Sequence, residues 1–567
     1  MAKISKEIKM IKKIKKFIIK NSLDGYIIPK NDSYFTEYSN INNLEKITNF
    51  SGSAGFALIL KNKNYLFVDG RYTFQAEQQS GRNFNILEIP YMWPKNLSNI
   101  ENHKIGFDPK LFTRDILEKY FENKCNLIPI CFNFNNKLKE KINYIYQLSD
   151  KIIGESSTSK ITRIKKYLRK NKINYLYISA SENVNWLLNI RGKDLPNSPQ
   201  ANCKMIISDT GKSFLFVNSR KILYLNRNKF KNIIFFDENK FFHIISNLKI
   251  GVFCIDKNTC SVFENDILNS KFKISSNIDP IYEIKSIKNS SEIKNVANAH
   301  IEDGIALTKF LYWYKNNNKK ITEKKLEKKL ENFRKKSKYY LFPSFDTIAG
   351  SGPNGAIIHY KSNNQTNRKI KKNDVLLVDS GGQYKWGTTD VTRTIISGMV
   401  SDKIKNNFTR VLKGHIAVTT CDIKKNFNGY LIDKLARKPL NKVGLDYSHG
   451  TGHGVGFFLN VHEGPQSISK YNKIKIKEGM ILSNEPGYYL KNKYGIRIEN
   501  LIYVKKINKK LIFKNLTYAP IDIDLINFKM LTKKEKNYLF DYHLEVYSKI
   551  SNYLNRNEKK WLISLIK

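Results

Sequence analysis

Apolar residues at the start of the chain recur at helical spacing and then gather into short runs typical of strands. Isoleucines at every third or fourth position from Ile4 to Ile18 predict an amphipathic first helix. The runs DGYIIP, GFALIL and NYLFVDGR follow it, and each predicts a β-strand. A helix lying on a membrane surface is the alternative for the lysine-rich opening. This order of a helix followed by strands leads us to expect that residues 1–150 form an α/β domain.

The same order of elements returns in the second segment, about residues 151–285. A polar GESSTSK stretch precedes a lysine-rich helical pattern over 161–170. The runs NYLYISA, KMIISD, SFLFV and KILYL then predict strands. This alternation of helix and strand predicts a second α/β domain of similar design.

The third segment, residues 286–567, begins with a long predicted helix. Asn289 or Ser290, followed by Glu292, is typical of a helix N-cap. A second charged helix is predicted over about 322–336, and the chain then becomes rich in glycine and in strand patterns.

Helical spacing returns at the end of the chain, over about 530–567. We therefore expect a helical C-terminal extension over about 507–567, after strand patterns that continue to about residue 506. The expected fold class is α/β (α+β), in three domains.

The chain carries a formal net charge of +48, which raises the alternative of a nucleic-acid-binding protein. The lysines are spread along the whole chain, and they accompany an excess of asparagine and isoleucine. A solvated basic surface explains this distribution, so no specific nucleic acid is expected. No apolar run reaches the length of about 18 residues that a membrane span needs, so no membrane partner is expected. Six cysteines without a CxxC pair predict free thiols and a cytoplasmic location.

Two aspartates that follow apolar runs are the first candidates for chemistry. DVLLVDSGG predicts a strand that ends at Asp379, and GTTDVTRTI places Asp390 eleven residues later. A hairpin-like connection would return Asp390 close to Asp379. Two buried carboxylates repel each other, and a cation between them would remove that cost. Ordinary turn or capping aspartates are the alternative.

Two glutamates belong to further strand patterns. GMILSNEPGYYL places Glu485 at the end of an apolar run, and YGIRIENLIYV alternates isoleucines with Arg497 and Glu499. Residues two apart in a strand share one face, so Arg497 and Glu499 would point the same way. That face is either a polar functional site or an exposed surface with an ion pair.

Two histidines, His449 and His453, lie four residues apart in the glycine-rich stretch LDYSHGTGHGVG. For His449 alone, a hydrogen-bonded core histidine is the alternative to a functional role. The candidate ligand set is Asp379, Asp390, His453, Glu485 and Glu499. Four carboxylates and one imidazole suit a hard or borderline divalent ion, and they carry more charge than one such ion balances. Two ions about 3.5–4 Å apart, sharing carboxylates, would balance the charge and activate water.

The order and spacing of these residues resemble the metal-dependent pita-bread aminopeptidase family, and within it the three-domain Xaa-Pro aminopeptidases. The likeness is carried by GPNGAIIHY, DSGGQYKWGTTDVTRT, LDYSHGTGHGVGFFLNVHEGP, NEPGYY and GIRIEN. It continues more weakly through FSGSAGFALI, VDGRY and NWLLNIRG in the first two segments. The resemblance implies two creatinase-like N-terminal α/β domains followed by a C-terminal pita-bread metallopeptidase domain.

The resemblance also implies a reaction and roles for individual residues. The candidate ligands would hold two divalent ions, usually Mn²⁺, and Glu485 would also accept a proton. Catalytic or substrate-side roles are implied for His359, His449, His462 and Arg497. The implied reaction releases the N-terminal residue from a peptide whose second residue is proline. A homodimer is expected by the same analogy.

Three alternatives share this architecture. Prolidases have the same fold and metals but cleave Xaa-Pro dipeptides, creatinases work without the metal set, and some pita-bread proteins bind partners without catalysis. The intact ligand set argues against the last two. One departure from the resemblance is Asn484, which stands where related sequences carry an acidic residue before EPGYY.

Overall fold

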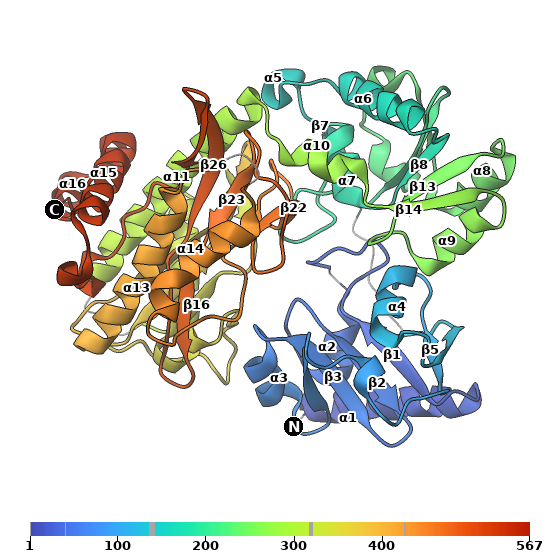
Figure 1. Ribbon diagram of the computed structural model, residues 1–567, viewed down its shortest axis with the longest axis horizontal. Helices are drawn as coiled ribbons and strands as arrows, with labels where there is room; N and C mark the ends of the chain where they lie inside the picture. The colour runs from blue at the N-terminus through green and yellow to red at the C-terminus, as the bar shows by residue number, and fades with distance from the viewer. Residues whose placement is uncertain (1, 40, 135–141, 317–320, 424–426, 567) are drawn as a thin grey trace. The chain divides into compact units, whose positions relative to one another are not determined.

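In this computed structural model, the described residues are 2–39, 41–134, 142–316, 321–423 and 427–566. The chain divides into two compact units (Figure 1). Unit 1 consists of Met1–Asp150 and Glu155–Tyr282, and unit 2 consists of Lys151–Gly154 and Glu283–Lys567.

Unit 1 contains two six-stranded mixed sheets with the same topology. Their strand orders are β4-β3-β2-β1-β5-β6 and β12-β11-β10-β8-β13-β14. In each sheet the third strand in this order pairs antiparallel with both neighbours, and the other pairs are parallel. The second segment therefore repeats the design of the first, as the sequence pattern predicted. The strands are β1 (Gly25–Pro29), β2 (Phe56–Leu60), β3 (Asn64–Asp69), β4 (Asn85–Ile89), β5 (Lys104–Phe107), β6 (Asn126–Pro129), β8 (Tyr175–Ile178), β10 (Lys204–Ser208), β11 (Ser213–Phe216), β12 (Ile233–Phe236), β13 (Val252–Asp256) and β14 (Lys273–Asn277).

Helix α1 (Ala2–Lys20) packs on the first sheet through the predicted apolar stripe. Ile11, Ile14 and Ile18 are buried in one core with residues of that sheet, whereas Ile8 is 39% exposed. The apolar face of α1 is thus covered by the core of unit 1, which disfavours a membrane-surface helix. In the described ranges, no helix is long and apolar enough to cross a membrane.

One predicted strand of unit 1 is wrong. The run KILYL lies in and after a 3-10 turn, η2 (Ser219–Ile222), and forms no strand. The Asn218 side chain accepts a hydrogen bond from Arg220 N at 3.0 Å, and this local cap favours the turn.

Unit 2 is built from two halves, each a sheet with two helices packed on it (Figure 1). In the first half, apolar residues of α11 and α12 form one core with the sheet β16-β17-β20. Helix α11 begins at the predicted N-cap Asn289, which forms a capping box with Glu292. The elements are α11 (Ser290–Lys315), α12 (Glu323–Arg334), β16 (Ile348–Ser351), β17 (Leu376–Ser380) and β20 (Val391–Ile395), with the hairpin β18 (Gly382–Tyr384) and β19 (Gly387–Thr388) between the last two.

In the second half, α13 and α14 pack on the five-stranded sheet β22-β21-β23-β26-β27. The hairpin of β24 and β25 stands between β23 and β26 in the chain. The elements are α13 (Asp402–Thr419), α14 (Gly429–Asn441), β21 (Gly452–Gly454), β22 (Glu463–Ile468), β23 (Ile481–Asn484), β24 (Gly487–Leu490), β25 (Tyr494–Arg497), β26 (Asn500–Ile507) and β27 (Lys510–Asn515).

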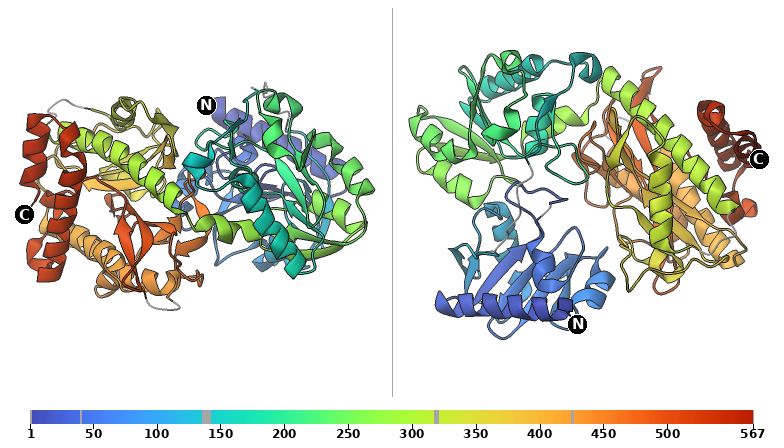
Figure 2. Two further views of the ribbon diagram at one scale, coloured as in Figure 1. Left: turned by 90° about the horizontal axis from the view of Figure 1, so that it is seen from above. Right: turned by 180° about the vertical axis from the view of Figure 1, so that it is seen from behind.

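The C-terminal region is α-helical only from Lys533 onward. Helices α15 (Lys533–Ile550) and α16 (Arg556–Ser564) pack against α11 (Figure 2). The expectation of a helical extension from about residue 507 is wrong for its first part, because β27 pairs with β26 as the edge strand of the sheet.

We expect Gly414→Ala to destabilise unit 2, because α13 and α14 approach closely at this residue. An added Cβ would lie 2.2 Å from the main-chain oxygen of Ala436, so the two helices would have to separate. Overpacking of this kind lowers the free energy of unfolding by about 1–3 kcal/mol. Calorimetry should therefore record a melting temperature several degrees lower, and an unchanged value would contradict the close packing.

Candidate metal centre

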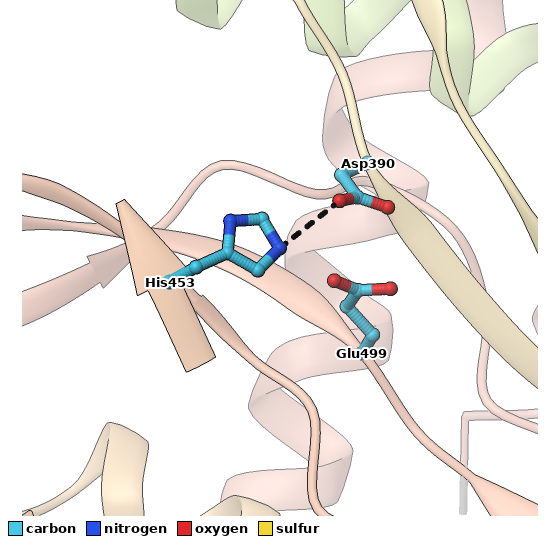
Figure 3. Close-up of side chains that lie close together, drawn as sticks. All are labelled: Asp390, His453 and Glu499. Atoms are coloured by element: carbon cyan, nitrogen blue, oxygen red, sulfur yellow. Dashed lines mark ion pairs between the residues drawn. The ribbon is translucent and has the colours of Figure 1, made fainter. Parts of the chain in front are cut away.

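Three of the candidate ligands meet in unit 2 (Figure 3). One ligand atom each of Asp390, His453 and Glu499 lies within 4.8 Å of the other two. Asp390 Oδ2 is 3.4 Å from His453 Nε2. Asp390 and Glu499 are 4% and 1% exposed, so both carboxylates are withdrawn from bulk water. Such a cluster of two buried acids and a half-buried imidazole can hold a cation.

Strand pairing brings these residues together from distant parts of the chain. Asp390 directly precedes β20, His453 lies in β21, and Glu499 stands between β25 and β26. Strand β20 pairs antiparallel with β17, the strand of Asp379, so the predicted hairpin-like return of the chain is confirmed. The Thr392 hydroxyl donates to Glu499 Oε2 at 2.7 Å, and Glu499 N donates to Thr392 O at 3.1 Å. One candidate ligand therefore directly precedes β20, and Thr392 of this strand orients another.

Glu485 and Asp379 lie beside these three residues. Glu485 follows β23 directly; its Oε1 is 3.5 Å from His453 Nε2 and accepts a hydrogen bond from Ser483 Oγ at 3.0 Å. Asp379 Oδ2 accepts a hydrogen bond from Arg497 Nη2 at 2.7 Å. The other oxygen of Asp379, Oδ1, is buried and has no hydrogen-bond partner among the described residues.

Hydrogen bonding fixes the ring of His453 with Nε2 toward the carboxylates. Its Nδ1 lies 2.9 Å from the carbonyl oxygen of Gly454. Because a carbonyl oxygen only accepts, Nδ1 carries a proton. A neutral ring then presents the lone pair of Nε2, as a histidine ligand of a divalent ion does.

The crowding of acids changes the protonation of the cluster. Burial, and then the charge of Asp379, raises the pKa of Asp390 to about 6, although the hydrogen bond to His453 opposes the rise. Burial, and then the charges of Asp390 and Glu485, raises the pKa of Glu499 well above its usual range. Burial favours the neutral ring of His453, but the hydrogen bond to Asp390 and the charge of Glu485 outweigh it and raise that pKa to about 9. Without a cation, the cluster therefore holds protons at neutral pH.

A hydrogen-bonded chain leads from His449 to the carboxylate of Asp379. The Tyr489 hydroxyl lies 2.9 Å from His449 Nε2 and accepts a hydrogen bond from Arg497 Nη1 at 2.6 Å. Arg497 in turn donates to Asp379 at 2.7 Å. His449 Nδ1 lies 2.7 Å from the carbonyl oxygen of Gly450, so Nδ1 carries a proton. The nitrogen of His449 whose protonation can change is therefore Nε2.

The other two predicted histidines lie at the edge of the same cluster. The ring centroid of His462 is 4.3 Å from that of His453, and the two rings are nearly perpendicular, at 86°. His359 is half-buried and follows Ile358, whose carbonyl oxygen lies 3.5 Å from Arg497 Nη2. The structure thus places the other predicted site residues in one region of unit 2, and His359 directly follows a residue whose main chain lies near Arg497.

One local prediction about this region is wrong, and one of its alternatives is excluded. Arg497 and Glu499 do not share one strand, because β25 ends at Arg497 and β26 begins at Asn500. Both side chains are 1% exposed, which also excludes the alternative of a surface ion pair. They still converge, because Arg497 Nε donates at 3.1 Å to Thr392 Oγ1, the same hydroxyl that donates to Glu499.

The sequence interpretation missed three hydroxyl-bearing residues that orient the cluster, Thr392, Ser483 and Tyr489. Ser483 Oγ accepts a hydrogen bond from His453 N at 2.9 Å and donates to Glu485. The two-residue period of a strand was the available signal for Thr392 and Ser483, since each lies two residues from a predicted ligand.

Asn484 ties the end of β23 to helix α13. The side-chain Nδ2 of Asn484 donates to His415 O at 2.9 Å and to Thr419 Oγ1 at 3.0 Å. The main-chain oxygen of Asn484 lies 3.1 Å from His415 Nδ1. An amide can donate the first two bonds, whereas an ionised carboxylate only accepts. Asparagine at this position also adds no further negative charge beside Glu485.

The sequence matches known families along almost its whole length. Residues 10–130 and 136–292 each match a creatinase/prolidase N-terminal domain, and residues 294–506 match metallopeptidase family M24. Residues 509–566 match the C-terminal region of peptidase M24. Xaa-Pro aminopeptidase 1 of Dictyostelium discoideum is 36% identical over 99% of this chain and 96% of its own. The chain belongs to the Xaa-Pro aminopeptidase family of M24 metallopeptidases.

Two further Xaa-Pro aminopeptidases match equally broadly, whereas a prolidase matches over a smaller part of this chain. The probable Xaa-Pro aminopeptidase P of Laccaria bicolor is 34% identical over 97% of this chain and 92% of its own. X-prolyl aminopeptidase from Caenorhabditis elegans, described as a cytosolic enzyme with a di-nuclear active site, is 29% identical, with a TM-score of 0.89 over 96% of this chain and 95% of that one. A prolidase from Thermococcus sibiricus is 26% identical, with a TM-score of 0.54, and covers 65% of this chain and 98% of its own. The expected architecture, two creatinase-like domains before a pita-bread metallopeptidase domain, is confirmed.

The cluster of Asp390, His453 and Glu499, together with Glu485 and Asp379 beside it, fits divalent cations. Four carboxylates and one imidazole nitrogen offer the oxygen and nitrogen atoms that Mn²⁺ and similar ions bind. The buried Oδ1 of Asp379 is an acceptor without a protein donor in the described residues, as a metal-binding oxygen would be. Burial and the crowding of these carboxylates raise the pKa values of Asp390 and Glu499. A bound cation would take the place of the protons.

We expect divalent ions to displace protons from the cluster. At neutral pH the raised pKa of His453 leaves its ring protonated in the metal-free chain, and Asp390 takes up a proton as pH falls toward 6. The pKa of Glu499 is raised in the same direction. Because ligands bind a metal in their deprotonated form, Mn²⁺ affinity should rise from about pH 5.5 to about pH 8.5. Isothermal titration calorimetry in buffers of different ionisation enthalpy measures the proton release, and an affinity independent of pH would contradict it.

Proposed function

We propose that this chain is a metallo-aminopeptidase that removes the N-terminal residue from peptides with proline in the second position. The main support is the meeting of Asp390, His453 and Glu499 in one buried cluster, with Glu485 and Asp379 beside them. The relatives matched over nearly the whole chain are named Xaa-Pro aminopeptidases. The proposed ligands of two divalent ions are Asp379, Asp390, His453, Glu485 and Glu499.

The ions, when bound, would supply positive charge that polarises the scissile carbonyl and lowers the pKa of water. The chain's own residues hold the ligands in place. Ser483 and Thr392 each donate a hydrogen bond to one glutamate carboxylate, and Arg497 holds Asp379. We assign Glu485, half-buried at the edge of the cluster, the role of accepting a proton from the attacking water.

Cleavage of an Xaa-Pro bond makes a proton donor necessary. The proline nitrogen carries no hydrogen, so this peptide group cannot donate the hydrogen bond that an ordinary peptide in a strand donates. The same nitrogen must gain a proton as it leaves. We assign this step to His449, which can carry a proton at Nε2 while Nδ1 stays bound to Gly450 O. His359 is the second candidate donor. His462, beside His453, and Arg497 are assigned to the substrate side.

The extent of the matches favours an aminopeptidase over a prolidase. The T. sibiricus prolidase matches over 98% of its own length but only 65% of this chain, whereas the C. elegans aminopeptidase covers 96% of this chain. The close acid–histidine cluster disfavours a non-catalytic binding protein, because burying four carboxylates is costly without a cation to hold.

The ion, the location and the assembly are finer proposals. Manganese suits the oxygen-rich ligand set. A cytosolic location is supported by the C. elegans relative, which is described as a cytosolic enzyme, and by six cysteines that form no disulfide. Apolar side chains exposed on α15 and α16, such as Phe540, Leu544 and Ile563, offer a surface for the expected homodimer.

Release of arginine from a bradykinin-like Arg-Pro-Pro peptide tests the proposed function directly. We expect turnover with Mn²⁺, its loss after chelation and its return on addition of the ion. An Xaa-Pro-Xaa tripeptide should be cleaved, because only a prolidase is restricted to dipeptides. The Gly-Pro dipeptide should not be cleaved. Cleavage of Gly-Pro alone would assign the chain to the prolidases, and no cleavage with any divalent ion would contradict the proposal.

His449→Gln should lower kcat about 100-fold or more, because general acid catalysis contributes about 10²–10⁴-fold. Mn²⁺ content should stay at the level of the unmodified chain, since His449 is not among the proposed ligands. His243→Gln, at an exposed histidine of unit 1, is the matched control. Turnover by His449→Gln within a factor of about two of that control would remove His449 from the mechanism.

A further inference from the structure

We propose that Arg393 is a positioning residue through which helix α15 holds the candidate metal ligand Glu499. The inference rests on the proposed function, because it concerns the geometry of that metal centre. Arg393 lies in β20, three residues after Asp390, and is 1% exposed. Its guanidinium reaches the strand of Asp390, the segment of Glu499 and the C-terminal region at once.

On one side, Arg393 binds the main chain around the ligand. Its Nη1 donates to Glu499 O at 2.7 Å and to Thr392 O at 2.8 Å. Its Nη2 donates to Asn500 Oδ1 at 2.8 Å. Arg393 therefore joins the end of the β25–β26 connection to β20.

These contacts fix the direction in which the Glu499 side chain leaves the backbone. The N–H of Glu499 donates to Thr392 O at 3.1 Å, and its carbonyl oxygen accepts from Arg393, so the peptide groups on both sides are held. The carboxylate itself is held by Thr392 Oγ1. Because Asp390 directly precedes β20, the strand of Arg393, these contacts also link the chain segments of two proposed ligands.

On the other side, the C-terminal region supplies the remaining acceptors. Arg393 Nε donates to Pro520 O at 2.9 Å, and Nη2 donates to Ala519 O at 2.7 Å and to the Tyr542 hydroxyl at 2.8 Å. Tyr542 lies on α15, and its hydroxyl donates to Ala519 O at 2.6 Å. The C-terminal region of the family thus has a specific task here, which is to hold the guanidinium in place behind Glu499.

The charge of Arg393 makes this arrangement sensitive to the loss of one partner. All six acceptors are neutral oxygens, and a buried arginine keeps its charge, so the hydrogen bonds must stabilise it. Burial, and then the charge of Arg393, lowers the pKa of His415 to about 3 and that of His543 to about 4. Both histidines therefore remain neutral and add no positive charge to this side of the centre.

Tyr542→Phe tests the inference, because it removes one partner of Arg393 without changing the packing volume. Tyr538→Phe is the matched control. Tyr538 lies one turn earlier on α15 and stacks on Tyr542, with ring centroids 6.4 Å apart, and no hydrogen bond joins it to Arg393 in the described part of the chain. Arg393→Lys, which keeps the charge but loses the fork of donors, is the second variant.

The readout is Mn²⁺ binding, by calorimetric titration and by the electron paramagnetic resonance of the bound ions, with the melting temperature of each metal-free chain. Loss of support behind a ligand weakens metal binding about 10–100-fold. We expect about tenfold or more for Arg393→Lys, about threefold or more for Tyr542→Phe, and the unmodified affinity for Tyr538→Phe.

A lower melting temperature with unchanged Mn²⁺ affinity and spectrum in both variants would make Arg393 a purely structural residue and overturn the inference. Equal weakening in Tyr542→Phe and Tyr538→Phe would also overturn it, because the effect would not depend on the hydroxyl bound to Arg393. Absence of Mn²⁺ binding by the unmodified chain is a different outcome, since it would remove the proposed function and the inference together.

Discussion

Repulsion among four carboxylates in one buried region of unit 2 is the constraint to which the surrounding residues respond. Asp379, Asp390 and Glu499 are almost fully buried, and Glu485 is only partly open to water. Isolated carboxylates at such sites would take up protons, as the raised pKa values of Asp390 and Glu499 indicate. Bound divalent ions would remove this repulsion and would keep every carboxylate ionised. The same positive charge is what hydrolysis of a peptide bond needs.

Around the acids, the fold provides donors at fixed positions. Hydroxyl groups of Ser483 and Thr392 orient one glutamate each, and Arg497 holds Asp379. Arg393 holds the main chain of Glu499 from the opposite side, toward α15. Asp379 and Glu499 are thus held by residues of other strands, so the centre depends on the pairing of β17 with β20 and of β23 with β26.

Much of this arrangement follows from patterns that are local in the sequence. Apolar runs ending in an acid predicted where strands carry candidate ligands, and the antiparallel return from Asp379 to Asp390 is confirmed. The capping pattern at Asn289 likewise located the start of α11. These predictions are correct because a strand or a cap is determined by residues within a few positions of each other.

The failures concern contacts between segments far apart in the chain. At the break between β25 and β26, the side chains of Arg497 and Glu499 both bind Thr392, which lies about a hundred residues earlier in the chain. The link from His449 through Tyr489 to Arg497 joins three segments, and no periodicity within any one of them reports it. The run KILYL shows the opposite case, in which an apolar pattern is overruled by the cap at Asn218.

Anomalous diffraction at the manganese edge, from crystals grown with Mn²⁺, would locate the ions that these carboxylates are proposed to bind. We expect two peaks between the side chains of Asp379, Asp390, His453, Glu485 and Glu499. A map without peaks at these side chains, or with the ions bound elsewhere on the chain, would contradict the proposed metal centre.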